Sequence, residues 1–347
     1  MRQPSVGARK RVRMRDVAQR AGVSISTVSL VLSGDPRIPE DTTQKVLQTV
    51  KAMEYRPSVI ARSLARRISR TIGVILPEIA FSKNQPFFYQ ALKGIHSETQ
   101  PAGFKMVVEA VNKGFIERRY YLRILKEQSA DGIIFLTPSV NDQFLQEMEK
   151  ESYPFVLVGG GVKDVDLPSA RGDDFGGAFA ATEHLIKLGH KAIGHISGLT
   201  NYFLGLDRRK GYEEAMKKAG LPIDPAWIQE GESDAEKAAE AAGKLADLGV
   251  TAIFAANDVM AYGALQALRR KQKRVPEDIA LVGMDDLEFS ALTNPSLTTV
   301  RYDIEKISAL AANFLLKQIQ SPIIPKTLLE EVPPPQLIVR ESCGGNK

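Results

Sequence analysis

Residues 13–33 carry two short helical periods with a glycine between them, which restricts the start of the chain to a pair of packed helices. Gly22 ends the first helix, because glycine adopts the left-handed conformation without steric cost. Ser24 then suits the N-cap of a second helix, since its hydroxyl can accept from a free backbone N–H. The apolar residues at helical spacing are Met14, Val17, Ala18 and Ala21 in the first helix and Val28, Val31 and Leu32 in the second.

The outward face of the second helix carries only short, uncharged side chains: Ile25, Ser26, Ser29 and Leu30. A helix that faces solvent normally carries Lys and Glu there, so this face is expected to lie close to another surface. The two helices and their turn therefore predict a helix-turn-helix, in which the second helix enters the major groove of DNA. A small helical hairpin of another kind has the same pattern.

The charge is divided unevenly along the chain and decides between these readings. Residues 1–70 contain 15 lysines and arginines against 5 acidic residues, a net charge of +10. The other 277 residues carry a net charge of −5, which gives the total of +5. A basic head on a mildly acidic body is typical of a nucleic-acid-binding protein, so the charge favours the DNA reader.

The same stretch resembles the head of a LacI/GalR-type bacterial transcription regulator. The resemblance rests on RDVAQRAGVSISTVSLVLSG, then on Ile38-Pro39-Glu40-Asp41-Thr42, Tyr55-Arg56-Pro57 and Ala61-Arg62-Ser63-Leu64. It implies a third helix at about 39–53 and a hinge helix at about 57–66 that forms only on the operator. By resemblance, Leu64 is wedged between base steps of the minor groove with Ala61 beside it. The other implied DNA contacts are Ser24, Ile25, Ser26, Thr27, Ser29 and Leu30.

Two positions depart from the family pattern. The family usually has a polar residue where this chain has Leu30, and a Thr or Ser where it has Arg13. Ile25 and Leu30 can read a base only by apolar contact, for example with a thymine methyl group, while Ser26 can hydrogen-bond but discriminates weakly. We therefore expect DNA shape and the kinked centre of the operator to contribute more of the specificity.

Length and composition limit the remaining possibilities. At 347 residues the chain has room for two or three domains, and 44% hydrophobic residues allow a full core. Its one cysteine, Cys343, excludes an internal disulfide or a multi-cysteine metal site and fits a reducing cytoplasm. The basic N-terminus lacks the apolar run of a signal peptide, and no stretch is long enough to span a membrane. We expect a cytoplasmic protein whose residues 1–12 form a flexible basic arm.

Behind residue 70, buried strands alternate with helices, which predicts βαβ units and parallel sheets. The first unit is expected to contain strands at 71–76, 105–110, 132–135 and 155–158 and helices at 87–100, 116–128 and 141–150. The second is expected to contain strands at 192–196, 252–255, 279–282 and 336–339, a crossing strand at 297–300, and helices at 177–188, 208–219, 235–248, 259–271 and 304–319. Two such units form a cleft, and ligands bind at the carboxyl ends of the strands.

The family resemblance extends over this region, through landmarks such as FAANDVMAYGALQALRR, VPEDIALVGMDD and LIVRES. It implies a core like that of periplasmic sugar-binding proteins. The fold class is therefore an all-α helix-turn-helix head with a hinge helix, followed by an α/β core of two parallel-sheet lobes. The expected lobes are about 71–171 with 302–325, and about 172–301 with 326–347.

Three polar residues are expected at the cleft, where the family places its effector contacts. Arg208 is expected to open a helix, Asn257 to follow the strand 252–255, and Asp285 to follow the strand 279–282. Carboxylate, amide and guanidinium groups together can bind vicinal hydroxyls, so they favour a sugar or polyol effector. Phe87 and Phe88 are candidates for stacking on an apolar sugar face or a base.

Each of these assignments has an alternative. Phe87 and Phe88 can equally be core residues, and Asp258, Asp174 and Asp286 can simply cap helices. Purine-binding relatives have aromatic or basic residues where this chain has Tyr202, Leu204 and Ser233, and the missing aromatic at Ser233 disfavours a purine. Some relatives take a phosphorylated partner protein instead of a small effector or beside it.

Signals of catalysis are weak. Gly159-Gly160-Gly161 lacks the spacing of a dinucleotide fingerprint, and we find no P-loop or nucleophile elbow. The four histidines show no metal-ligand spacing, so we expect no enzyme activity, no cofactor and no metal.

The sequence thus predicts a transcription regulator, most simply a repressor, that binds a near-palindromic operator as a homodimer. Its expected parts are an arm (1–12), a helix-turn-helix domain (13–56), a hinge helix and linker (57–70) and an effector-binding, dimerising core (71–347). An exported sugar-binding protein would lack the basic head, and a sugar kinase fused to a DNA reader would need a phosphate loop.

Overall fold

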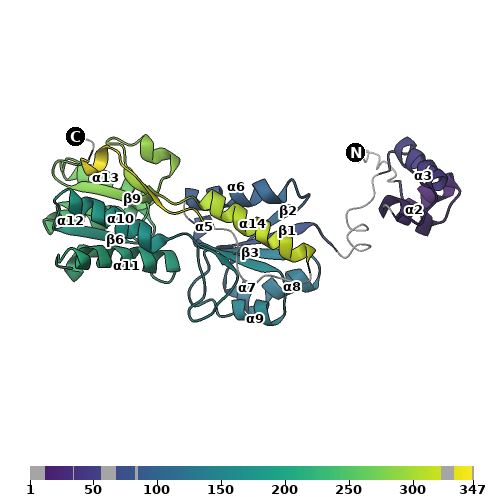
Figure 1. Ribbon diagram of the computed structural model, residues 1–347, viewed down its shortest axis with the longest axis horizontal. Coiled ribbons are helices and arrows are strands. Elements are labelled where there is room, and N and C mark those ends of the chain that lie inside the picture. Colours follow the sequence, from purple (N-terminus) through teal and green to yellow (C-terminus); the bar gives the residue numbers. More distant parts are fainter. Residues whose placement is uncertain (1–11, 34, 56–67, 83–84, 322–331, 346–347) are drawn as a thin grey trace, which may run out of the picture. The chain divides into compact units, whose positions relative to one another are not determined.

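A computed structural model describes residues 12–33, 35–55, 68–82, 85–321 and 332–345. The chain divides into two compact units, Met1–Ser69 and Arg70–Lys347 (Figure 1). The predicted arm, except residue 12, and the hinge positions 57–66 with Ala61 and Leu64 lie outside the described residues.

The first unit contains helices α1 (Met14–Ala21), α2 (Ile25–Ser33) and α3 (Glu40–Ala52), which confirms the predicted pattern. Gly22 takes φ 66° at the end of α1, and the Ser24 hydroxyl accepts from the backbone N–H of Thr27 at 3.0 Å. The Asp16 carboxylate accepts from the N–H of Arg13 at 2.8 Å, so the start of α1 is capped although Arg13 has no capping side chain. The buried core of this unit is Val17, Ala18, Ala21, Val28, Val31, Val46 and Tyr55.

The first α/β layer, here lobe one, is a parallel sheet in the order β2-β1-β3-β4-β5. Its strands are β1 (Thr71–Pro77), β2 (Lys105–Val111), β3 (Gly132–Leu136), β4 (Phe155–Val158) and β5 (Ser169–Ala170). The short α5 (Ile79–Ser82) follows β1. Helix α6 (Pro86–Thr99) packs with the late helix α14 (Ile304–Gln320) on one face of the sheet, as Figure 1 shows. The other face is covered by α7 (Lys113–Glu117), α8 (Tyr120–Lys126) and α9 (Leu145–Lys150).

Two helix predictions in lobe one are wrong in extent. The helix expected at 116–128 is two helices, α7 and α8, because Arg119 between them takes φ 48°, which an α-helix cannot continue through. The helix expected at 141–150 begins only at Leu145. The preceding residues form a turn in which the Asp142 carboxylate accepts from the N–H of Ser139.

The second α/β layer, here lobe two, has the strand order β11-β10-β9-β8-β6-β7, and only β11 among these strands runs antiparallel to its neighbour. Its helices form two packed pairs, and alternate residues of the strands face each pair. The pairs are α10 (Asp174–Lys187) with α11 (Phe203–Lys218), and α12 (Ala235–Asp247) with α13 (Asp258–Arg270). The strands are β6 (Ile193–Ser197), β7 (Ile228–Glu230), β8 (Ala252–Ala255), β9 (Ala280–Asp285), β10 (Thr298–Arg301) and β11 (Gln336–Ile338).

The crossing strand expected at 297–300 is β10 (Thr298–Arg301), which lies within the sheet and pairs in parallel with β9. Two other expectations for lobe two need correction. The helix expected from Arg208 begins five residues earlier, at Phe203. Gly205 lies on the buried face of this helix, where it approaches the carbonyl of Leu199 too closely for a side chain. Asp285 ends strand β9 rather than following a strand that stops at 282.

Candidate functional site

The N-terminal end of α2 is the most exposed part of the predicted reading helix. Ser24, Ile25 and Ser26 are exposed, and Ile25 keeps 52% of its surface accessible. The hydroxyls of Ser24 and Thr27 lie 2.9 Å apart and bond to each other. Thr27, Ser29 and Leu30 are half-buried, so only one edge of each is accessible. This end presents an uncharged, shallow surface.

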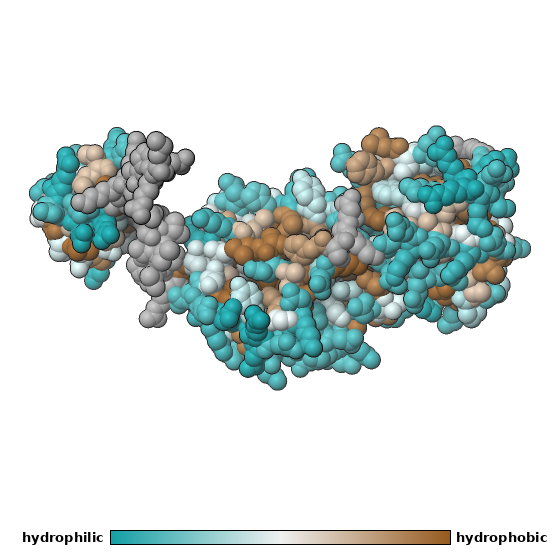
Figure 2. Space-filling model, turned by 180° about the vertical axis from the view of Figure 1, so that it is seen from behind, coloured by the Kyte–Doolittle hydropathy of each residue, from teal (hydrophilic) through white to brown (hydrophobic). Residues whose placement is uncertain are grey.

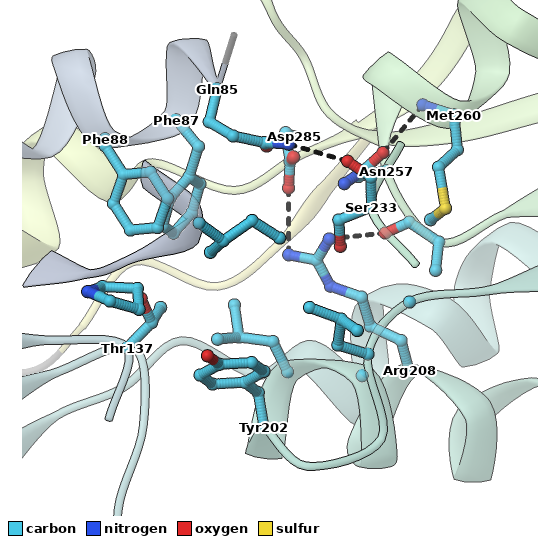
Figure 3. A pocket seen from close by; sticks show the side chains of 17 residues that line it. Gln85, Phe87, Phe88, Thr137, Tyr202, Arg208, Ser233, Asn257, Met260 and Asp285 are labelled. Carbon is cyan, nitrogen blue, oxygen red and sulfur yellow. Dashed lines mark hydrogen bonds and ion pairs between the residues drawn. The ribbon is translucent and has the colours of Figure 1, made fainter. Parts of the chain in front are cut away.

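A pocket lies between the lobes at the carboxyl ends of their strands, and it brings together all five residues predicted to bind an effector (Figure 3). The space between protein atoms there is about 640 Å³, including the part that opens to solvent. The five predicted residues that line it are Phe87, Phe88, Arg208, Asn257 and Asp285.

Arg208 stands at the back of the pocket, in the second turn of α11, and is almost fully buried. Its Nε donates to the Asp174 carboxylate at 2.8 Å, and a terminal nitrogen lies 2.9 Å from Oδ1 of Asp285. It also donates to the carbonyl of Ala256. These contacts fix the guanidinium between two carboxylates. Burial lowers the pKa of Arg208, but Asp285 and Asp174 outweigh this and raise its pKa overall, so it stays charged.

Asp174 and Asp286 were possible helix caps, and neither acts as one. Asp173 caps α10 by accepting from the N–H of Gly176, while Asp174 pairs with Arg208. Asp286 pairs with Arg301 at 2.8 Å and with Arg340 at 2.7 Å.

Asn257 lines the pocket as predicted, but the helix cap expected of Asp258 is made by Asn257 instead. Asn257 is the N-cap of α13, because its side-chain oxygen accepts from the N–H of Met260 at 2.8 Å, and its amide nitrogen remains at the pocket (Figure 3). Asp258 caps no helix. Its buried carboxylate accepts from Leu287 N–H, Ser290 Oγ and Thr299 Oγ1. Asp258 thereby ties the start of α13 to β10 and to the loop that follows Asp285.

The two buried carboxyls beside the pocket have raised pKa values. Burial raises the pKa of Asp258 to about 7, and the nearby carboxylate of Asp285 adds to this. Burial also raises the pKa of Asp285 to about 6, although its partner Arg208 opposes the shift. Asp285 and Asp286 have φ angles of 119° and 53°, which a non-glycine residue adopts only when the surrounding structure holds it there. Such backbone strain occurs preferentially at functional sites.

An aromatic wall from lobe one faces these polar groups. Phe87 and Phe88, in the first turn of α6, meet edge to face with centroids 5.6 Å apart. Phe88 also belongs to the lobe-one core, so the alternative assignment to the core holds for it in part. Both rings line the pocket, and an apolar wall opposite a polar one suits a ligand with both kinds of surface.

Several residues that line the pocket were not among those predicted, above all Gln85 and Thr137. The Gln85 amide donates to the carbonyl of Ser233 at 2.7 Å, which links lobe one to lobe two across the pocket. Thr137 directly follows β3, so the rule that ligands bind at strand ends could have identified it. Gln85 gives no such signal, because its partner is a loop residue 148 positions away.

Within the described ranges, no group of three or more His, Cys, Asp and Glu side chains is arranged to hold a metal ion. None of the helices in these ranges is both long and apolar enough to cross a membrane.

Comparison with known proteins gives consistent matches to both units. Residues 13–58 match a family model described as bacterial regulatory proteins, lacI family, and residues 182–343 match a periplasmic binding protein-like domain. The regulator DegA of Bacillus subtilis is 34% identical over 333 residues, which cover 95% of this chain and 97% of DegA. The repressor PurR of Aliivibrio salmonicida is 30% identical over 332 residues, covering 95% and 98%.

Solved structures agree. The transcriptional regulator CelR in complex with cellobiose has a TM-score of 0.72 and 30% identity, over 96% of this chain and 100% of that one. The lac repressor dimer bound to operator and the anti-inducer ONPF has a TM-score of 0.83 and 27% identity, over 96% and 99%.

Proposed function

The chain belongs to the LacI family of bacterial regulatory proteins, and from this premise we propose how its parts divide the work. It is a DNA-binding transcription regulator and not an enzyme. In our proposal residues 13–56 read DNA, residues 57–70 form the hinge helix and linker, and residues 71–347 bind a small effector and pair two copies. Binding of the effector changes the arrangement of the two lobes. This change alters the affinity of the dimer's two DNA-binding heads for a near-palindromic operator.

We propose that the effector is a carbohydrate. The observation that carries this is the convergence of Arg208, Asp285 and Asn257 opposite Phe87 and Phe88 in one pocket. Carboxylate, amide and guanidinium groups bind vicinal hydroxyls, and an aromatic wall suits the apolar face of a sugar ring. The similar regulator CelR is known in complex with cellobiose. Ser233 lines the pocket where an aromatic residue would favour a purine.

On the DNA side, we propose direct contacts from Ser24, Ile25, Ser26, Thr27, Ser29 and Leu30. The exposure of Ile25 supports an apolar contact with a thymine methyl group. The family resemblance assigns the minor-groove wedge to Leu64 with Ala61.

We propose that the working form is a homodimer paired through lobe one. Strand β2 lies at the edge of its sheet, and Val107 and Val108 are exposed on it. Phe81 and Tyr89 are exposed on the neighbouring helices, and Figure 2 shows a hydrophobic area on lobe one. An exposed apolar area beside an unpaired edge strand is unfavourable in a monomer. We therefore propose that a second copy of the chain packs against this area and this strand.

A gel-shift titration tests the proposal. Promoter fragments would be titrated with the full-length protein at several salt concentrations, with and without a panel of neutral sugars and of purines. We expect a salt-sensitive preference for one fragment over random duplex, and a change in that affinity with a sugar. A response to purines alone would reject the carbohydrate assignment but leave the regulator in place.

A further inference from the structure

The space at the carboxyl ends of the lobe-one strands continues beyond the effector pocket into a second cavity. This cavity measures about 620 Å³, again counting the part open to solvent, and its far side is lined by Glu78, Ser139 and Asp142. The two cavities share part of their lining, so they adjoin each other. The shared residues are Pro77, Ile79, Thr137 and Tyr202.

Thr137 stands on the boundary between the cavities in an unusual state. The residue is only 6% exposed, yet its hydroxyl oxygen has no hydrogen-bond partner among the described residues. A buried hydroxyl without a partner costs free energy that a bound ligand can recover. Thr137 also takes φ 42°, a strained conformation for a β-branched residue. Figure 3 shows Thr137 with Tyr202 on the side of the pocket away from Asn257 and Met260.

The polar lining of the second cavity defines the ligand group that fits it. Glu78 and Asp142 supply carboxylates, and Thr137, Ser139 and Tyr202 supply hydroxyls, while no lysine or arginine is among the described residues that line the cavity. Such a set accepts hydrogen bonds from ligand hydroxyls and repels a phosphate or carboxylate. The group held there is therefore not anionic, and the hydroxyls of a sugar ring match this lining.

We propose that this second cavity is a subsite of the effector pocket, and that the effector is an uncharged disaccharide or longer glycoside. One ring lies against Arg208 and Asp285. The next ring forms a hydrogen bond with the Thr137 hydroxyl, which can donate or accept. This assignment rests on the proposed carbohydrate function and narrows it to a class of sugar.

The floor of the second cavity also joins the two lobes. The N–H of Val140 and the hydroxyl of Ser139, both in lobe one, donate to the carbonyl of Asn201 in lobe two, at 2.9 and 3.1 Å. A ring held beside Ser139 thus lies next to a contact between the lobes. Occupancy of this subsite is therefore coupled to how the lobes are arranged.

Calorimetric titration of the full-length protein tests the subsite. The probes are glucose against maltose, cellobiose and trehalose, and galactose against lactose and melibiose. We expect at least one disaccharide to bind at least tenfold more tightly than its own monosaccharide. Thr137→Val should lower disaccharide affinity about tenfold and monosaccharide affinity by a clearly smaller factor, because only the second ring bonds to the Thr137 hydroxyl. Thr137→Ser, which keeps the hydroxyl, should restore most of the loss.

A matched control is Thr182→Val, a buried threonine whose hydroxyl donates within α10 to the carbonyl of Ala178. It should leave both affinities unchanged. Equal binding of mono- and disaccharides, or an equal effect of Thr137→Val on both, would overturn the subsite and leave the carbohydrate function standing. Tighter binding of trehalose 6-phosphate than of trehalose would overturn its neutral character. If no probe sugar binds, the carbohydrate function falls together with the subsite.

Discussion

At the scale of single residues, the central feature of the pocket is that its cation and its anions hold one another in place. Asp174 and Asp285 hold the Arg208 guanidinium in place, and Arg208 in turn holds the Asp285 carboxylate. The guanidinium of Arg208 and the carboxylate of Asp285, which face the ligand, are therefore oriented before any effector binds. Preorganised groups bind more tightly because little ordering is left to occur on binding.

The first prediction concerns Asp285. Asp285→Ala removes a carboxylate acceptor and leaves Arg208 with one ion-pair partner, so effector affinity should fall about 10- to 100-fold, the range of a charged hydrogen bond. Operator affinity without effector should stay within about twofold. Calorimetry and gel shift measure the two quantities, and Asp247→Ala, an exposed partner of Lys271, serves as the control. A normal effector response would remove Asp285 from the site.

The second prediction concerns pH and rests on Asp258. Its pKa is raised from 3.8 to about 7, so the folded state holds a proton that the unfolded state releases. The contribution of this proton to the free energy of unfolding is fully present below about pH 4 and is lost as the pH rises through about 7. The loss is on the order of a few kcal/mol. Asp258→Asn keeps the shape and removes the titration, so its stability should fall less between pH 5 and pH 8.

Urea unfolding at several pH values measures the effect. The surrounding Leu287 N–H, Ser290 and Thr299 can bond to an amide as they do to the acid, so the variant should fold. Asp247→Asn is the exposed control. Parallel curves for the wild-type protein and Asp258→Asn would show that Asp258 carries no linked proton.

These residues also show how far a sequence can predict a site. Arg208, Asn257 and Asp285 were found because strand ends of parallel sheets meet at one edge, which is a property of the chain order. Which of two neighbours, Asn257 or Asp258, would cap the helix was not predictable. That choice depends on Ser290 and Thr299, which reach Asp258 only in the folded sheet.

At the scale of elements, the head depends on the turn between α1 and α2. Gly22 has φ 66°, and a Cβ placed there would meet nothing nearer than the Lys45 ammonium at 3.7 Å. Space is therefore available, and the cost of a side chain lies in the backbone conformation alone.

The third prediction follows from this turn. Gly22→Ala should destabilise the head by about 1–2 kcal/mol, the cost of the left-handed conformation for an L-residue. Gly22→Asn should cost less, because asparagine tolerates that region. Thermal unfolding and operator affinity of the full-length variants measure this, with effector binding expected to stay unchanged. Equal stability of the alanine and wild-type proteins would show that the turn adapts at no cost.

Elements were predicted well where hydrophobic period and a glycine or cap agreed, as in α1, α2 and α13. The break between α7 and α8 was missed because Arg119 gives no glycine or proline signal, yet it takes φ 48°. Its guanidinium pairs with Glu147 of α9 at 2.7 Å, so a contact distant in sequence accompanies the break. The antiparallel direction of β11 was not predicted, for a similar reason. It is determined by the return of the chain from lobe one, which is not visible in the residues of the strand itself.

At the scale of the whole core, the lobes are held together around the pocket by contacts on two sides. The Gln85 amide reaches the Ser233 carbonyl on one side, and residues 139–140 bond to Asn201 on the other. Neither contact has a pattern in the sequence, because both join loops of different lobes. They determine how readily the lobes part, and that equilibrium is what an effector can shift.

The fourth prediction tests the first of these contacts. Gln85→Ala removes one cross-lobe hydrogen bond, worth about 1 kcal/mol, so affinity for an effector that needs the closed lobes should fall about fivefold. Gln85→Glu should cost more, because its carboxylate cannot donate and would face the Ser233 carbonyl. Small-angle scattering of the ligand-free variants separates a contact between lobes from a contact to ligand, since only the former enlarges the free protein. Gln100→Ala, an exposed glutamine just after α6, should change neither quantity. If Gln85→Ala scatters like the wild-type protein and yet loses affinity, Gln85 acts on the ligand directly and the lobes are held by other contacts.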